Sequence, residues 1–222
     1  MNNYAPLPEV RAGLRRGCRR LARCEDGVTL VELAVVLPVF LLIFFGLIDF
    51  GRLAFHYVAA EKAMHIAARV AAVRPPACGG VPQTNTRGPL APSDIPPNFG
   101  SLCREGANVC SNPGTISCTG SAANSTANEI WALIQGALPN DATVANLSFS
   151  YAYDSNLGFL GGPYVPIVTV EVQNLNFEFV SPLSALVGLS GGVADPDLGS
   201  AIPFPAMSVS LPAEDLALGN NG

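Results

Sequence analysis

Gly27, Val28 and Glu32 are the residues whose types and spacing most directly suggest chemistry, because they stand at the start of a long apolar run. If the peptide bond after Gly27 is cleaved, Val28 becomes a free N-terminus with a positively charged amine. Glu32 then lies one helical turn from this amine, on the same face of a helix. A charge inside a membrane costs roughly 3 kcal/mol, so pairing the Glu32 carboxylate with an amine would lower the cost of burial.

A purely structural interpretation of the same residues is also open. Thr29 and Glu32 have the spacing of a capping box, in which Thr29 would be the N-cap residue and Glu32 would reach back to it. A carboxylate in the first helical turn is also favoured by the helix dipole. The two interpretations do not exclude each other, since Glu32 can cap the helix and pair with an amine.

The apolar run that follows has the length of a membrane span. It covers Val28–Ile48, which is 21 residues, and from Leu33 to Ile48 it carries no charge. A helix rises about 1.5 Å per residue, so about 20 residues cross a bilayer core. Pro38 lies inside the run and is expected to kink the helix rather than end it. The sequence therefore predicts one transmembrane helix.

Charge sets the expected orientation of this helix. Residues 1–74 hold ten of the twelve Lys and Arg residues, six of which are arginines that precede the run, whereas residues 75–222 hold two basic residues against eleven acids. Basic residues flank the cytoplasmic end of a span, so we expect a cytoplasmic N-terminus and a periplasmic C-terminal part. Asp49-Phe50-Gly51-Arg52 after the run is a poor site for ordinary signal cleavage.

These motifs resemble a known family. Gly27, with Glu32 at the fifth position after it, resembles a class III prepilin peptidase site. The stretches Glu32–Arg52 and Glu61–Arg69 are similar to TadE-type pseudopilins of tight-adherence (Flp) pilus systems, and the resemblance covers roughly residues 25–74. Leu33 departs from the aromatic residue usual after this Glu in major pilins, which favours a minor, TadE-like role.

The resemblance implies a function, partners and a location. The chain would be a pseudopilin-like subunit, cleaved after Gly27 by a prepilin peptidase and acting through helix packing. Its partners would be that peptidase, other pilin-like subunits and an inner-membrane assembly platform. It would lie in the bacterial inner membrane, with incorporation into the extracellular pilus left open.

The expected fold class is α+β, in four parts. Residues 1–27 form a basic cytoplasmic leader, and 28–74 a transmembrane and spine helix that Pro75-Pro76 ends. Residues 75–127 form a loop rich in Pro, Gly and Cys, and 128–222 a short helix with a small antiparallel sheet. Asp49 and Arg52 are expected to form an exposed pair on the spine.

Four cysteines are expected to tie the loop down. Cys78, Cys103, Cys110 and Cys118 lie on the periplasmic side, where two disulfides are favoured and three connectivities remain open. Zinc is the competing interpretation, but no C-x-x-C spacing occurs. Cys18 and Cys24 lie in the leader and are expected to be free thiols.

The remaining elements follow from periodicity and capping patterns. The apolar spacing of residues 126–138 predicts a short helix that starts with a capping box of Thr126 and Glu129. Alternating apolar residues predict three strands, with a bulge or turn near Gln173-Asn174, in the ranges Thr143–Tyr153, Pro166–Val180 and Ala206–Leu211. The spine and the short helix would cover one face of this sheet.

The same residues argue against several function classes. No phosphate-binding glycine loop, G-x-S-x-G elbow or H-E-x-x-H motif occurs, so we expect no enzyme activity, cofactor or small-molecule substrate. His56 and His65 would lie on opposite helix faces, so no metal site is expected. The net charge of −5 disfavours nucleic-acid binding. The main alternative is an uncleaved, membrane-anchored periplasmic binding module that uses the disulfide loop; an anchored enzyme is a weaker one.

Overall fold

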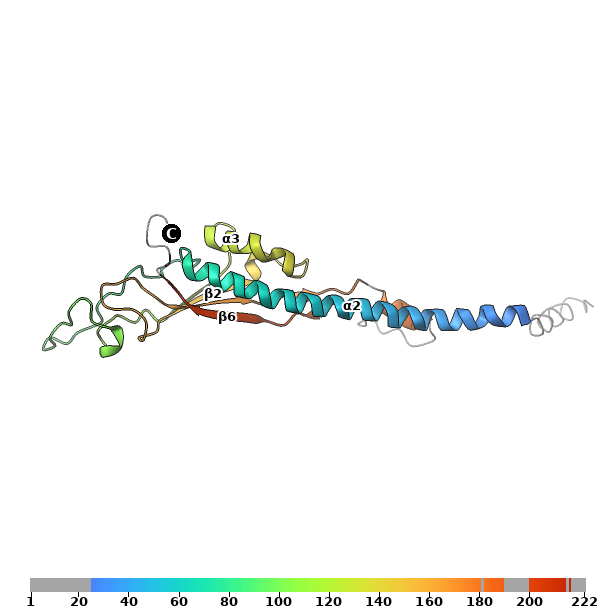
Figure 1. The fold of residues 1–222 in the computed structure, drawn as a ribbon, viewed down its shortest axis with the longest axis horizontal. Coiled ribbons are helices and arrows are strands. Elements are labelled where there is room, and N and C mark those ends of the chain that lie inside the picture. Colours follow the sequence, from blue (N-terminus) through green and yellow to red (C-terminus); the bar gives the residue numbers. More distant parts are fainter. Residues whose placement is uncertain (1–24, 181, 190–199, 215, 217–222) are drawn as a thin grey trace, which may run out of the picture. The chain divides into compact units, whose positions relative to one another are not determined.

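The computed structural model describes residues 25–180, 182–189, 200–214 and 216, and these form an α+β fold (Figure 1). The chain divides into two compact units. Unit 1 comprises residues 1–50 and 179–200, and unit 2 comprises residues 51–178 and 201–222. The basic leader, with Cys18 and Cys24, lies outside the described residues.

One long helix, α2 (Glu25–Val73), supplies residues to both units. It starts three residues before the predicted spine and ends one residue before its predicted end, ahead of Pro75-Pro76. Pro38 lies inside α2, and the helix continues through it. A proline within an apolar helix is therefore accommodated here, while the kink itself remains a prediction.

The core of unit 2 contains a four-stranded antiparallel sheet in the order β1-β2-β3-β6. Its strands are β1 (Thr115–Thr119), β2 (Leu147–Ala152), β3 (Ile167–Val172) and β6 (Met207–Pro212). Alternate residues of the two central strands are buried, as in a sheet with one covered face. These are Leu147, Phe149, Tyr151, Val168, Val170 and Val172.

The predicted strand Ala206–Leu211 corresponds closely to β6, whereas β3 covers only the first part of the predicted range Pro166–Val180, and β2 begins four residues later than predicted. A 3-10 helix, η3 (Val144–Asn146), precedes β2 where a strand was expected. Strand β1 was not predicted, because Ile116 is its one strongly apolar residue and it lies among prolines, glycines and cysteines. The predicted change near Gln173-Asn174 is confirmed: Asn174 has φ 57°, and β4 (Asn176–Phe177) then pairs with β5 (Ile202–Pro203).

The part of α2 in unit 2 buries a face of small residues. Along this face the side chains are 5% exposed or less, as follows: Ala60, Ala63, Met64, Ala67, Ala68, Ala71 and Ala72. Figure 1 shows this part of α2 running along the sheet. Because the alanine side chains are small, large side chains of the strands, such as Phe149 and Tyr151, can fill the space between the helix and the sheet.

Helix α3 (Ser125–Ile134), continued by η2 (Gln135–Ala137), completes the core of unit 2. The predicted capping box is wrong, because Asn124 is the N-cap and its side-chain oxygen accepts from the Ala127 amide at 2.9 Å. The Thr126 hydroxyl instead donates to the carbonyl of Pro75 at 2.7 Å, and Glu129 pairs with Arg74 at 3.1 Å. Both side chains thus hold α3 against the end of α2.

Candidate functional site

The candidate cleavage site lies in the first turns of α2. Gly27 and Val28 are helical in the uncleaved chain, since α2 begins at Glu25. Thr29 is therefore inside the helix rather than at its N-cap, so a capping box at this position does not start α2. Glu32 follows on an exposed part of the helix. A free amine at Val28 would lie one turn from this carboxylate if the helix persists after cleavage.

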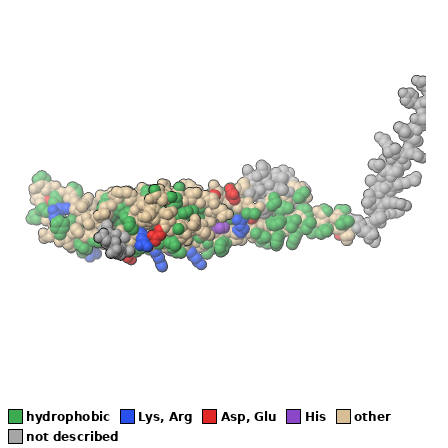
Figure 2. All heavy atoms as spheres, turned by 90° about the horizontal axis from the view of Figure 1, so that it is seen from above, with side chains coloured by type: hydrophobic (Ala, Val, Ile, Leu, Met, Phe, Trp, Pro, Cys, Tyr) green, Lys and Arg blue, Asp and Glu red, His purple; other side chains and the backbone are tan. Residues whose placement is uncertain are grey.

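The first half of α2 presents large apolar side chains to its surroundings. Between Leu30 and Ile48 many of these are 44% exposed or more, among them Leu30, Val31, Leu33, Val35, Val36, Phe40, Ile43 and Leu47. The most apolar window of the helix has a mean hydropathy of 2.8, and the helix is long enough to cross a membrane (Figure 2). Soluble proteins rarely expose so large an apolar surface, which indicates a surface that is covered in the cell.

One face of this half is less exposed than the rest. Its residues recur at helical spacing, and they are Pro38, Leu41, Leu42, Phe45, Gly46 and Asp49. Asp49 is only 1% exposed and accepts a hydrogen bond from the Val180 amide at 3.3 Å. The prediction of an exposed Asp49 is therefore wrong. The sequence did contain a signal for this contact, because residues 179–194 carry no charge and so suit an apolar helix face.

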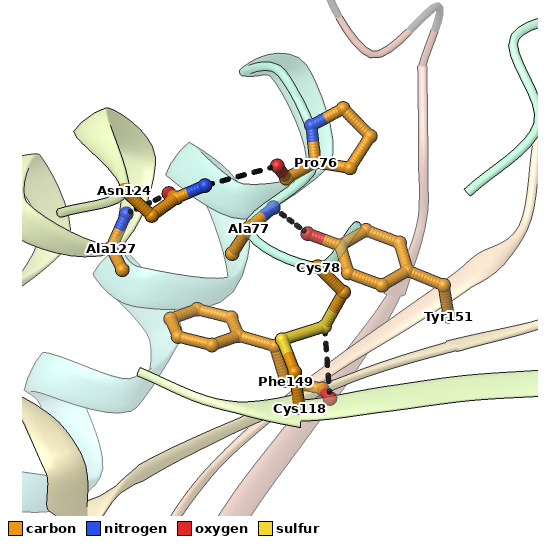
Figure 3. The surroundings of a disulfide bond; sticks show 8 residues. All are labelled: Pro76, Ala77, Cys78, Cys118, Asn124, Ala127, Phe149 and Tyr151. Atoms are coloured by element: carbon orange, nitrogen blue, oxygen red, sulfur yellow. Dashed lines mark hydrogen bonds between the residues drawn. A yellow bond between two sulfur atoms is a disulfide. The ribbon is translucent and has the colours of Figure 1, made fainter. Parts of the chain in front are cut away.

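The disulfide Cys78–Cys118 joins the chain leaving α2 to strand β1 (Figure 3). The disulfide sulfur of Cys78 lies 3.6 Å from the carbonyl oxygen of Phe149, and the Ala77 amide donates to the Tyr151 hydroxyl at 2.8 Å. Burial raises the pKa of Tyr151, while the hydrogen bond from Ala77 opposes this shift. These contacts fix the first residues after α2 onto the sheet.

The second disulfide, Cys103–Cys110, closes a short loop in the same unit. Both cysteines are buried with Leu160, and Val109 and Tyr153 pack against them. Next to this disulfide is an open hollow of about 430 Å³, lined among others by Arg104, Asn112, Tyr153 and Asp154. Among the three possible connectivities, the pairing is thus Cys78–Cys118 with Cys103–Cys110.

Two stacked tyrosines lie next to this loop. The rings of Tyr153 and Tyr164 are 6.5 Å apart, and the hydroxyl of Tyr164 is buried with no hydrogen-bond partner in the described part of the chain. Burial, and then the proximity of Tyr153, raise the pKa of Tyr164 to about 12. Burial and the neighbouring Asp154 carboxylate also raise the pKa of Tyr153.

The two histidines differ in their surroundings. His56 Nδ1 lies 3.5 Å from the carbonyl oxygen of Ala137, and the His56 ring lies 6.0 Å from that of Phe177. His65 is exposed. Within residues 25–180, 182–189, 200–214 and 216, no group of three potential metal ligands occurs.

Comparison with known families identifies the first part of the chain. Residues 27–69 match the model of a family described as TadE-like protein, as the sequence resemblance indicated. No curated protein and no solved structure gives a match. The match covers the candidate cleavage site, Glu32 and most of α2. The segment 27–69 of this chain is therefore TadE-like, which supports a role associated with the tight-adherence pilus.

Proposed function

We propose that this chain is a pseudopilin-like subunit in the assembly of a tight-adherence (Flp-type IVb) pilus. A prepilin peptidase cuts it after Gly27, and the mature chain acts through packing of α2 with other pilin-like subunits in the inner membrane or the fibre. The observation that carries the proposal is the exposed apolar surface between Leu30 and Ile48, in a segment that matches the TadE-like family.

The apolar surface supports a membrane location for the precursor. Before assembly, lipid covers these side chains, and the leader arginines hold the N-terminus in the cytoplasm. In assembly, neighbouring α2 helices replace part of the lipid, because large apolar side chains pack equally well against other helices. Since lipid and helix surfaces are both apolar, this exchange has no hydrophobic driving force, and van der Waals packing and polar pairs between helices drive it.

Glu32 supports a specific register for this packing. It is the one charged residue in the run Val28–Ile48, and it is exposed. In lipid or between helices, an isolated carboxylate is unfavourable. Pairing with the Val28 amine of the same or a neighbouring subunit removes that penalty, and such an amine exists only after cleavage. Cleavage and assembly are thereby coupled.

Contacts within unit 2 hold its part of α2 in place. They are the packing of the buried alanine face, the Arg74–Glu129 ion pair and the Cys78–Cys118 disulfide. The part of α2 that belongs to unit 2 and the sheet thereby share one packed core within that unit.

Intact-mass analysis of the membrane-extracted chain tests the proposal. The chain is expressed with and without a prepilin peptidase, and Gly27→Ala is compared with Gly46→Ala, a helical glycine whose added methyl group meets nothing within 4 Å. We expect a mature chain that begins at Val28 only with the peptidase, with its amount reduced in Gly27→Ala and unchanged in Gly46→Ala. A full-length chain under every condition contradicts the proposal.

The second candidate is an uncleaved, membrane-anchored binding module. The hollow beside Cys103–Cys110 favours it, since one acidic, one basic and one amide side chain lie around a tyrosine ring there. A full-length chain in the mass experiment, together with a ligand whose binding is lost in Asp154→Ala, would support this candidate over the pilus role.

A further inference from the structure

Unit 1 contains a second apolar element besides α2. Phe179, Val180 and helix α4 (Leu183–Leu189) belong to a stretch of sequence, residues 179–194, that has no charged residue. We call Phe179, Val180 and residues 182–189 the 179–189 segment. No helix was predicted there from the sequence, because seven residues are too few for a clear helical period.

The 179–189 segment lies beside the apolar part of α2. Both belong to the same compact unit, and Figure 1 shows α4, in orange, next to α2. The rings of Phe50 and Phe179 meet edge to face at 5.9 Å, and Leu186 is 7% exposed. The less exposed face of α2 described above has the helical spacing expected for a surface that another element partly covers.

Asp49 stabilises this arrangement at the end of the apolar run. Its carboxylate is 1% exposed and accepts the amide proton of Val180. Buried charges and buried backbone amides are both unfavourable unless they are hydrogen-bonded. The bond therefore satisfies an acceptor and a donor at the point where the segment first meets α2.

The outer side of the segment remains uncovered in a single chain. Val180 is 74% exposed and Leu189 is 71% exposed. Both are apolar, and they belong to the same compact unit as the exposed apolar residues of α2. A water-exposed segment of this kind would ordinarily carry charges, as the loops of unit 2 do at Arg87, Asp94 and Arg104.

We propose that the 179–189 segment is a second membrane-embedded element, which lies in the periplasmic leaflet against α2 and turns Val180 and Leu189 to the lipid chains. This inference rests on the proposed membrane location of α2. The turns of α4 pair part of its backbone, as a segment in lipid requires, and the Leu186 amide donates to the carbonyl of Pro182. The Asp49 carboxylate takes over this role for Val180, which precedes α4.

Depth-dependent fluorescence quenching in liposomes tests the inference with the full chain. The native tryptophan is replaced (Trp131→Phe), and one new tryptophan is placed at Leu189 (Leu189→Trp). Phe44→Trp reports on the proposed span, and Ile95→Trp, at a loop position that is 91% exposed, reports on water. Val180→Trp repeats the measurement should Leu189→Trp fail to fold. Lipids brominated on their acyl chains quench from within the bilayer, and acrylamide quenches from water.

We expect brominated lipid to reduce the Leu189→Trp emission to an extent comparable with Phe44→Trp, and acrylamide to have little effect on either. Quenching of Leu189→Trp by acrylamide, to the extent found for Ile95→Trp, overturns the inference while leaving the span in place. Protection from both quenchers also overturns it, because a protein partner then covers the segment. Absence of lipid quenching at Phe44→Trp contradicts the membrane location of α2 itself, and with it the proposed function.

Discussion

The two halves of α2 are similar in apolar content, but only the second half, which also exposes Phe55 and Val58, has a fully buried apolar face. In unit 1, large side chains such as Val35, Phe40 and Leu47 are between 58% and 71% exposed, whereas in unit 2 Ala67 and Ala68 are fully buried. The difference follows from side-chain size and distribution. Large residues surround the first half on most sides, which suits lipid or other helices. Alanines line one face of the second half, with Glu61, Lys62 and Arg69 exposed elsewhere, which suits close packing on a sheet.

This comparison predicts that the stability of the second half depends on its attachment to the rest of unit 2. The double variant Cys78→Ser with Cys118→Ser is expected to lower the free energy of unfolding of unit 2 by about 2–5 kcal/mol, because the bond spans 40 residues. Chemical denaturation in detergent, followed by the fluorescence of Trp131, measures this change. The matched double variant of Cys103 and Cys110, which are seven residues apart, should have a smaller effect. Equal effects would argue against the role assigned to the longer link.

Overpacking the alanine face sharpens the same comparison. Ala67→Leu is expected to destabilise unit 2 by about 1–3 kcal/mol, since the added atoms enter a fully packed interior. The same substitution at the exposed Ala54, in the same helix, should change the denaturation midpoint little. A neutral Ala67→Leu would mean that this face is not packed against the sheet.

Alkaline pH should loosen unit 2 through Tyr164. Burial raises the pKa of this hydroxyl to about 12, against an ordinary value of 10, so the folded chain holds the proton more tightly than the unfolded chain does. The resulting stability is fully present below pH 10 and is lost progressively as the pH rises toward 12. Denaturation midpoints measured over this range should fall, and Tyr164→Phe should reduce the slope. An unchanged slope in the variant would assign the effect to other groups.

The smallest effect is expected at the Arg74–Glu129 ion pair. Both side chains are about two-fifths exposed, and exposed pairs contribute about 0.2–1 kcal/mol. Arg74→Ala, Glu129→Ala and the double variant form a cycle whose coupling energy gives the contribution of the pair. A coupling well above this range would show that α3 depends on the pair more than its exposure suggests.

Much of the backbone could be predicted from periodicity. The spine, two of the strands and the turn near Asn174 follow from apolar spacing over long ranges, where the signal accumulates. Strand β1 is five residues long and has one strong apolar residue, so its place in the sheet comes from pairing with β2 and from Cys118. Such tertiary determinants leave little trace in the local sequence.

The polar contacts were the hardest to predict. Thr126 and Glu129 have the spacing of a capping box, but Pro75 and Arg74 lie close enough to compete for them, and Asn124 takes the N-cap position. Asp49 follows an apolar run and suggests a surface position, yet it is buried against Val180. In each case a partner distant in sequence decides the outcome. Gly27 and Glu32, by contrast, were identified from their local spacing together with the resemblance to a prepilin peptidase site, and their roles remain proposals.

The role of Glu32 is tested most directly by the amount of other pilin-like subunits that copurifies with the chain from detergent-extracted membranes. The comparison is between Glu32→Gln and Glu61→Gln, an exposed glutamate of the same helix beyond the apolar run. We expect Glu32→Gln to lose most of this association and Glu61→Gln to retain it, with both chains processed at Val28. Equal association of the two variants would contradict assembly through a pair between Glu32 and the Val28 amine.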